Sequence, residues 1–284
     1  MQINYPVNPK LEAAYNVRLL RDDFEDLAAN WVERSKQTRN NASVRLDCAY
    51  GQKECNKLDI FYSGELDAPL YVFIHGGYWQ RGDKSIYSLI SEPFLENGID
   101  VAIIGYPLCP TVSMTELVDD VHQAVIWLYR NAPELGISRY RINVSGHSAG
   151  GHLTAMLLAR TQFQAQNKFP DNLIKSGIPF SGLYDLAPLL QTTISHALHL
   201  SEEEVVNLSP DQLEPSGRAP VLAIVGGAET DAFHQQTDDF LLHWGQRGIV
   251  VDKYVEPEAD HFDLINRLAD SDSEMFIGIK HWLR

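Results

Sequence analysis

The sequence contains little cysteine. Its three cysteines, Cys48, Cys55 and Cys109, are too few and too scattered for a disulfide framework or for a zinc site with four ligands. We therefore expect reduced, structural thiols and a functional site without a metal.

Long apolar segments and an excess of positive charge are also missing. The longest apolar runs, such as 71–74 and 221–225, are far too short to span a membrane, and the first ten residues lack the apolar core of a signal peptide. Lysine and arginine total 23 against 38 aspartates and glutamates, a formal charge of −15. A field of that sign repels phosphate backbones and anionic lipids. We expect a cytoplasmic protein without nucleic-acid or membrane partners.

What remains is the composition of an ordinary globular protein. The chain has 284 residues, 44% of them hydrophobic, with no repeat or polar linker, which predicts a single domain over 1–284. Short apolar strands alternate with longer helical stretches, a pattern typical of an α/β fold with a mostly parallel sheet flanked by helices. We expect strands at 70–74, 101–104, 142–145, 178–180, 221–225 and 250–255, with an early edge strand at 58–61.

Two further segments complete the predicted fold. The first forty residues have helical spacing, with an apolar stripe at Leu20, Phe24, Leu27, Ala28 and Trp31. Residues 182–218 form a long insertion that we interpret as a small helical cap over the site, with a plain surface excursion as the alternative.

The strongest chemical motif is Gly-His-Ser-Ala-Gly at 146–150, placed between a predicted strand and a predicted helix. A sharp turn there exposes the Ser148 hydroxyl, and the flanking glycines keep side chains away from the neighbouring strand and helix. The N–H of Ala149 lies at the helix start, where an unpaired donor meets an oxyanion. The pattern predicts Ser148 as a nucleophile.

A second motif, His-Gly-Gly-Tyr-Trp at 75–79, follows an earlier strand. Gly76 and Gly77 allow backbone N–H groups to point into the cleft as oxyanion donors. We expect His75 to brace this loop. Tyr78 and Trp79 either line the substrate pocket or pack against the cap.

A serine nucleophile needs a base, and the base needs an acid. Of ten histidines, His261 follows the last predicted strand, in the order serine, acid, histidine. His147 flanks the nucleophile and is expected to serve packing. The acid should follow the strand at 221–225, where Glu229 and Asp231 are both candidates; Glu229 is favoured because it lies nearer the strand end.

With these motifs the chain resembles the α/β-hydrolase superfamily and, within it, the kynurenine formamidase (arylformamidase) group. The resemblance spans nearly the whole chain and is carried by the segments 15–16, 33–35, 75–79, 106–110, 146–152 and 225–229. His-Gly-Gly-x-Trp is fairly specific to this group, whereas Gly-x-Ser-x-Gly indicates only the superfamily. The resemblance implies Ser148 as nucleophile and His261 as base, with Glu229 where members of the group often carry aspartate.

The resemblance also implies an activity. The group hydrolyses the formamide of N-formylkynurenine in tryptophan breakdown through an acyl-enzyme, without a metal or organic cofactor. Its relatives also cleave simple esters, so a broad short-chain carboxylesterase is the first alternative, and a non-catalytic binding module is the second. The expected partner is a small-molecule substrate. The resemblance allows a homodimer but does not require one. The carboxylate of an amino-acid substrate would need a donor such as Arg81, Lys84 or a residue of the cap.

Overall fold

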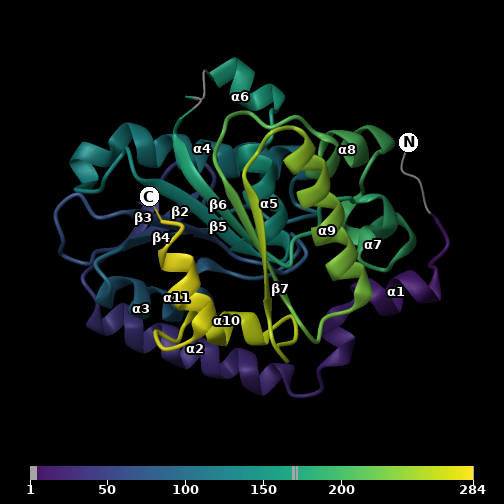
Figure 1. Cartoon of the computed structure of the whole chain (residues 1–284), viewed down its shortest axis with the longest axis horizontal. Helices are drawn as coiled ribbons and strands as arrows, with labels where there is room; N and C mark the ends of the chain where they lie inside the picture. Colours follow the sequence, from purple (N-terminus) through teal and green to yellow (C-terminus); the bar gives the residue numbers. More distant parts are fainter. Residues whose placement is uncertain (1–4, 168–169, 171, 284) are drawn as a thin grey trace.

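The computed structural model describes residues 5–167, 170 and 172–283 and is built around one eight-stranded sheet (Figure 1). The strand order is β1-β2-β4-β3-β5-β6-β7-β8. The β1–β2 and β2–β4 pairs are antiparallel, and all the other neighbours are parallel. The strands are β1 (Val44–Ala49), β2 (Lys57–Phe61), β3 (Leu70–Ile74), β4 (Asp100–Ile104), β5 (Ile142–His147), β6 (Ile174–Phe180), β7 (Val221–Gly226) and β8 (Val251–Glu256).

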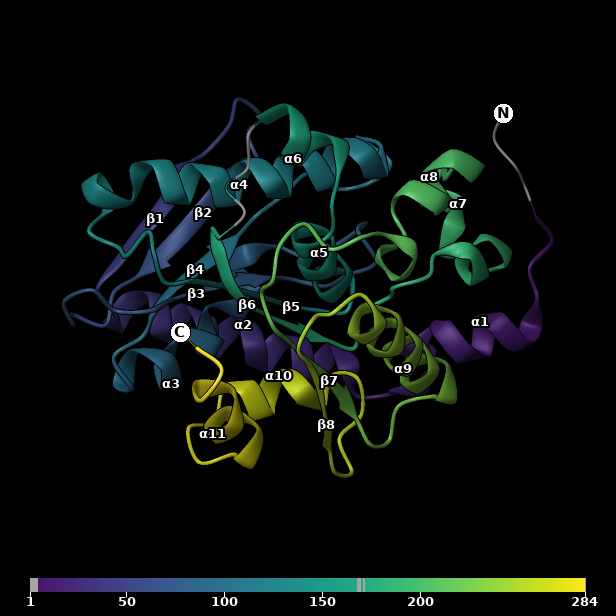
Figure 2. The same ribbon diagram turned by 45° about the horizontal axis from the view of Figure 1, so that its top comes forward.

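Helices cover both faces of this sheet (Figures 1 and 2). One face is covered by α4 (Met114–Leu135), α5 (Ala149–Leu158) and α9 (Asp231–Gln246). The other is covered by α2 (Phe24–Asn41), α3 (Ser91–Glu96), α10 (Asp263–Leu268), α11 (Glu274–Lys280) and the 3₁₀ helix η2 (Lys84–Ile90). The remaining helices are α1 (Pro9–Tyr15), η1 (Val17–Leu20), α6 (Gln162–Asn167), η3 (Ala187–Gln191), α7 (Ser195–Leu198), α8 (Glu202–Asn207) and η4 (Pro210–Gln212).

The strand β3 shows why the central strands read as continuous apolar runs. Leu70, Val72 and Ile74 point into the core on one face, whereas Tyr71 and Phe73 point into the core on the other, and all five side chains are fully buried. A strand covered on both faces has no solvent side and therefore no polar alternation. Each such aliphatic or phenyl side chain contributes roughly 1.5–3 kcal/mol by leaving water.

The predicted α/β fold with a mostly parallel sheet is confirmed, and the predicted strand at 70–74 is β3 as the structure has it. The expectation that 58–61 forms the sheet edge is wrong, because β1 lies outside β2. The sequence pattern hid β1 for a physical reason: it is largely exposed, carries Arg45 and Asp47, and its register shifts between Arg45 and Cys48.

The N-terminal segment is helical as expected, although residues 1–4 of the predicted helical stretch lie outside the described residues. Leu20 is 62% exposed, so it does not belong to the apolar stripe of α2. Residues 182–218 contain η3, α7, α8 and η4, all short. Among the described residues, no helix combines the length and apolar character needed to cross a membrane.

Candidate active site

The turn between β5 and α5 has the geometry of a nucleophile elbow. Ser148 has φ 59° and ψ −117°, a strained conformation for a residue with a side chain. The flanking glycines make the turn sterically feasible. A Cβ on Gly146 would lie 2.3 Å from the Gly150 carbonyl oxygen, and one on Gly150 would lie 1.9 Å from the Ile74 carbonyl oxygen. The turn therefore requires glycine at both positions, and Ser148 stands at its apex.

The Gly76–Gly77 loop lies directly against this elbow. A Cβ on Gly76 would come within 2.8 Å of the His147 carbonyl oxygen and 3.1 Å of the Ser148 Cβ. Gly77 has φ 114°, and a Cβ there would lie 2.1 Å from the Arg81 carbonyl oxygen. The backbone at Gly76 therefore lies directly against Ser148, beside the elbow where oxyanion donors are expected.

His75 holds the Gly76–Gly77 loop in place through a hydrogen bond and a ring contact. Its Nδ1 bonds the Gly76 carbonyl at 2.8 Å, and its ring stacks on Tyr106 with centroids 4.2 Å apart, while the Tyr106 hydroxyl donates to the His75 carbonyl. Burial lowers the pKa of His75 to about 4, so the imidazole is neutral at physiological pH. His75 therefore acts as a brace.

His261 and Glu229 form a buried pair. The His261 Nδ1 donates to the Glu229 Oε2 at 2.7 Å, and the side chains are 4% and 0% exposed. The other carboxylate oxygen, Oε1, accepts from the Gly226 N–H at 2.9 Å and from the Ser181 hydroxyl. Of the two candidate acids, Glu229 is the one that contacts His261, whereas Asp231 is an exposed residue in the first turn of α9. The pairing leaves Nε2 as the nitrogen that is able to accept a proton.

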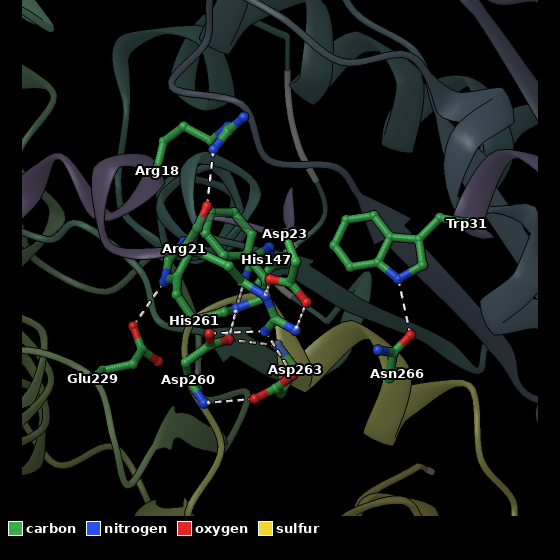
Figure 3. Close-up of polar contacts among 11 residues, drawn as sticks. Arg18, Arg21, Asp23, Trp31, His147, Glu229, Asp260, His261, Asp263 and Asn266 are labelled. Carbon is green, nitrogen blue, oxygen red and sulfur yellow. Dashed lines mark hydrogen bonds and ion pairs between the residues drawn. The ribbon is translucent and has the colours of Figure 1, made fainter. Parts of the chain in front are cut away.

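A second histidine packs against this pair. The His147 ring centroid lies 4.5 Å from that of His261, and its Nε2 donates to the His261 carbonyl at 2.7 Å. Desolvation lowers the pKa of His147 well below its ordinary value, so it is a neutral donor. The Phe233 ring also packs against His261, with ring centroids 4.8 Å apart. These contacts limit the rotation of the imidazole; Figure 3 shows His147, His261 and Glu229 together with their polar contacts.

Ser148 and His261 open into one cavity of about 420 Å³. Part of its wall comes from residues 16–31 at the start of the chain, which we call the N-terminal wall; Val17, Leu19, Phe24 and Trp31 are among the residues it contributes. The aromatic part of the lining is completed by Tyr78, Tyr87 and Phe262. From residues 182–218, Thr193 and Ile194 reach the cavity. The role of that segment as a cap stays a prediction.

Tyr78 and Trp79 have different surroundings. Tyr78 lines the cavity, donates its hydroxyl to the Tyr15 carbonyl, and has a pKa raised by burial. Trp79 is fully buried and packs edge-on against His152, with ring centroids 5.0 Å apart, so its side chain lies in the core beneath the loop and outside the cavity lining. Only Tyr78 of the two faces the substrate space.

The cationic candidates are also separated by the structure. Lys84 is buried and bonds Asp47 at 2.8 Å and Asp59 at 2.7 Å, outside this cavity. Arg81 lines the cavity, and within residues 5–167, 170 and 172–283 its guanidinium has no ion pair. Arg18 also lines the cavity but already bonds Glu25 at 2.6 Å. Arg81 is therefore the cation available to an anionic ligand.

Two features of the site escaped the sequence analysis. Ser181 follows β6 directly, and its position at the carboxyl end of a parallel strand is a signal that predicts a site residue. The N-terminal wall had no comparable signal, because its contacts join residues more than 230 positions apart, such as Trp31 and Asn266.

Comparisons with known proteins place the chain among hydrolases. A family model described as BD-FAE matches residues 58–214, which include both glycine motifs but neither Glu229 nor His261. A protein named kynurenine formamidase from Salmo salar is 31% identical over 248 residues, which cover 84% of this chain and 82% of that protein. One with the same name from Drosophila melanogaster is 28% identical over 228 residues, covering 77% and 75%.

Solved structures agree on the fold. A crystal structure from Silicibacter sp., described provisionally as a thioesterase, superposes with a TM-score of 0.84 at 31% identity and covers 96% of this chain and 100% of that one. Esterase B from Lactobacillus rhamnosis superposes with a TM-score of 0.71 at 17% identity, covering 96% and 94%, and indicates the fold alone.

Proposed function

The chain belongs to the BD-FAE family of α/β-hydrolases and is a hydrolase, and from this premise we propose that it is an arylformamidase acting on N-formylkynurenine-like substrates. The observation that carries the proposal is that the Ser148 elbow and the His261–Glu229 pair open into one aromatic-lined cavity. The similarity to kynurenine formamidases over most of the chain supports the choice of a formamide.

The proposed mechanism is acyl transfer to water. The Ser148 Oγ attacks the formyl carbonyl while the His261 Nε2 takes the hydroxyl proton, and Glu229 holds the Nδ1–H and stabilises the imidazolium. Backbone N–H groups of Ala149 and Gly77, with Gly76 beside them, hold the oxyanion; losing one such donor costs about 10²–10³-fold in rate. The C–N bond then breaks, and His261 delivers its proton to the leaving aryl amine. Water repeats the cycle on the formyl-enzyme and releases formate.

The cavity suits an aryl leaving group. Its volume of about 420 Å³ lies within the range of small-molecule sites, roughly 300–1,000 Å³. Phe24, Trp31 and Phe262 supply faces and edges for packing against an aromatic ring. Arg81 supplies a cation for the α-carboxylate of an amino-acid substrate.

A short-chain carboxylesterase is the second candidate. An ester carbonyl needs the same nucleophile, base and oxyanion donors, and its alkoxide leaves more easily than an amine. Relatives named isoprenylcysteine alpha-carbonyl methylesterase from Arabidopsis thaliana, one of them 29% identical over 182 residues, favour this alternative. That match covers 59% of this chain and 43% of that protein, a smaller share than the matches to the formamidases cover.

A comparison of kcat/KM for N-formylkynurenine and nitrophenyl acetate separates the candidates. We expect the formamide to be the better substrate, with one formate released per turnover, and Ser148→Ala to lose both activities. Efficient ester cleavage without formate release from N-formylkynurenine would contradict the formamidase assignment and favour the esterase.

A further inference from the structure

Arg21 joins the N-terminal wall to the loop that carries His261. It lies between η1 and α2, and its Nη1 bonds Asp260 Oδ2 at 2.8 Å and Asp263 Oδ1 at 2.7 Å (Figure 3). Its Nε bonds Asp23 at 2.8 Å. The Arg21 side chain is only 17% exposed, so solvent screens these contacts less than it would on an open surface.

The two residues that Arg21 binds, Asp260 and Asp263, begin and end a tight turn that contains His261. We call this turn, residues 260–263, the histidine turn. Asp260 Oδ1 accepts from the N–H groups of Phe262 at 2.8 Å and Asp263 at 2.9 Å. In return, the Asp260 N–H donates to Asp263 Oδ2 at 3.1 Å. Holding both carboxylates thus holds the backbone on either side of His261.

Arg21 is also tied to the cavity lining. Arg18, which lines the cavity, donates to the Arg21 carbonyl at 3.1 Å. A further link joins the N-terminal wall to α10, the helix that follows the histidine turn: the Trp31 indole N–H donates to Asn266 at 2.9 Å. The N-terminal wall is therefore connected to the histidine turn through Arg21 and to the helix that follows it through Trp31.

We propose that Arg21 is a positioning residue for His261: it fixes the histidine turn against the N-terminal wall, so that the imidazole is held in reach of Ser148. The inference rests on the proposed roles of Ser148 and His261. Arg21 does not line the cavity and touches no reacting group, so its effect is on the placement and charge environment of the base and not on substrate binding.

The charged groups near His261 predict how the loss of Arg21 changes the pH dependence of kcat. The groups around the His261 ring are Glu229, the neutral His147, and the histidine turn with Asp260, Asp263 and Arg21. Removal of the guanidinium leaves the two aspartates without their counter-ion, and nearby negative charge favours the imidazolium. The acid limb of the kcat profile therefore moves to higher pH in an Arg21 variant.

The test compares Arg21→Met with Arg247→Met, a matched arginine that pairs with Glu214 at 3.0 Å at the C-terminal end of α9. We expect Arg21→Met to lower kcat by about 10- to 100-fold, the scale of a misplaced catalytic group, with KM little changed. The same loss should appear with nitrophenyl acetate and with N-formylkynurenine, the acid limb should rise, and Arg21→Lys should recover part of kcat. Arg247→Met should behave like the wild type.

Asp263→Asn provides a second test that retains the size of the side chain. It weakens the contact between Arg21 and the histidine turn, so it should also lower kcat. Because it removes a negative charge near His261, it should move the acid limb to lower pH. Wild-type kcat and pH profile in Arg21→Met would overturn the proposal, and so would an unperturbed Asp263→Asn if Arg21→Met did not fold. Wild-type enzyme that cleaves only the ester would overturn the formamidase assignment and leave this comparison intact with the ester as substrate.

Discussion

At the scale of single residues, both oxygens of the Glu229 carboxylate are engaged. Oε2 receives the His261 Nδ1–H, while Oε1 is bonded by Ser181 and by the Gly226 N–H. A carboxylate held at both oxygens cannot rotate without breaking a charge-assisted hydrogen bond. Glu229 has one more methylene than the aspartate common in the group, and Ser181 and Gly226 anchor that longer side chain.

Ser181→Ala tests this anchoring. It removes a hydrogen bond to a charged group, worth about 1.5–3 kcal/mol, so kcat should fall about tenfold or more if the bond orients Glu229. The control is Ser176→Ala in β6, the strand that precedes Ser181; the buried Ser176 hydroxyl donates to Asn143 at 2.8 Å, away from the site. That variant should lose thermal stability but keep kcat. Equal kcat values for the two variants would show that Ser181 does not orient the acid.

Arg81→Met tests recognition of a substrate carboxylate. The variant should lower kcat/KM for N-formylkynurenine by about 10- to 100-fold, the value of one charge-assisted hydrogen bond, because the carboxylate loses its counter-ion. Hydrolysis of formanilide, which has no carboxylate, serves as the matched control and should be unchanged. Equal losses on both substrates would assign Arg81 a structural role instead.

At the scale of elements, the sequence predicted the strands and turns whose structure is determined by residues next to them in the chain. β3 is apolar on both faces, β5 alternates Ile142 and Val144 with polar residues, and each strand runs into a glycine motif, so β3, β5 and the elbow were recognisable from residue order alone. β1 was missed because it is exposed and irregular, and the N-terminal wall because its place over the site depends on contacts with α10 and the histidine turn. The helical pattern of α2 predicted a helix but carried no information about its neighbours.

Trp31→Ala tests the N-terminal wall as part of the substrate site. Removing the indole should lower kcat/KM for formanilide about tenfold while changing methyl acetate hydrolysis little, since burying an aromatic surface stabilises only the aryl substrate. The variant should also lose about 3–5 kcal/mol of stability, so Trp31→Phe is the milder companion. Trp127→Ala, in α4 on the opposite face of the sheet, is the control. A uniform loss on both substrates would contradict a role in aryl recognition.

At the scale of the whole molecule, several buried histidines couple folding to pH. Burial lowers the pKa of His75 and of His152 to about 4, below the value of about 6.5 that the unfolded chain has. Between these values the unfolded state binds more protons than the folded state, so stability rises with pH across this window. The same linkage means that stability is lost as pH falls from about 6.5 towards 4.

Thermal unfolding between pH 4 and 7 measures this coupling. We expect Tm to fall steadily below pH 6.5, and His152→Gln, which keeps a donor for the Leu208 carbonyl, to flatten the dependence. His281→Gln, at an exposed residue of the last turn, should leave the slope unchanged. An identical slope in His152→Gln and the wild type would mean that other groups control acid stability.

The most direct test of the whole account is the mass of the protein after reaction with a fluorophosphonate, followed by peptide mapping. The account predicts a single adduct on Ser148, with loss of hydrolysis in proportion to labelling, and labelling that is slowed strongly in His261→Ala. Retained hydrolysis in an enzyme fully labelled at Ser148, or labelling that is indifferent to His261, would contradict it.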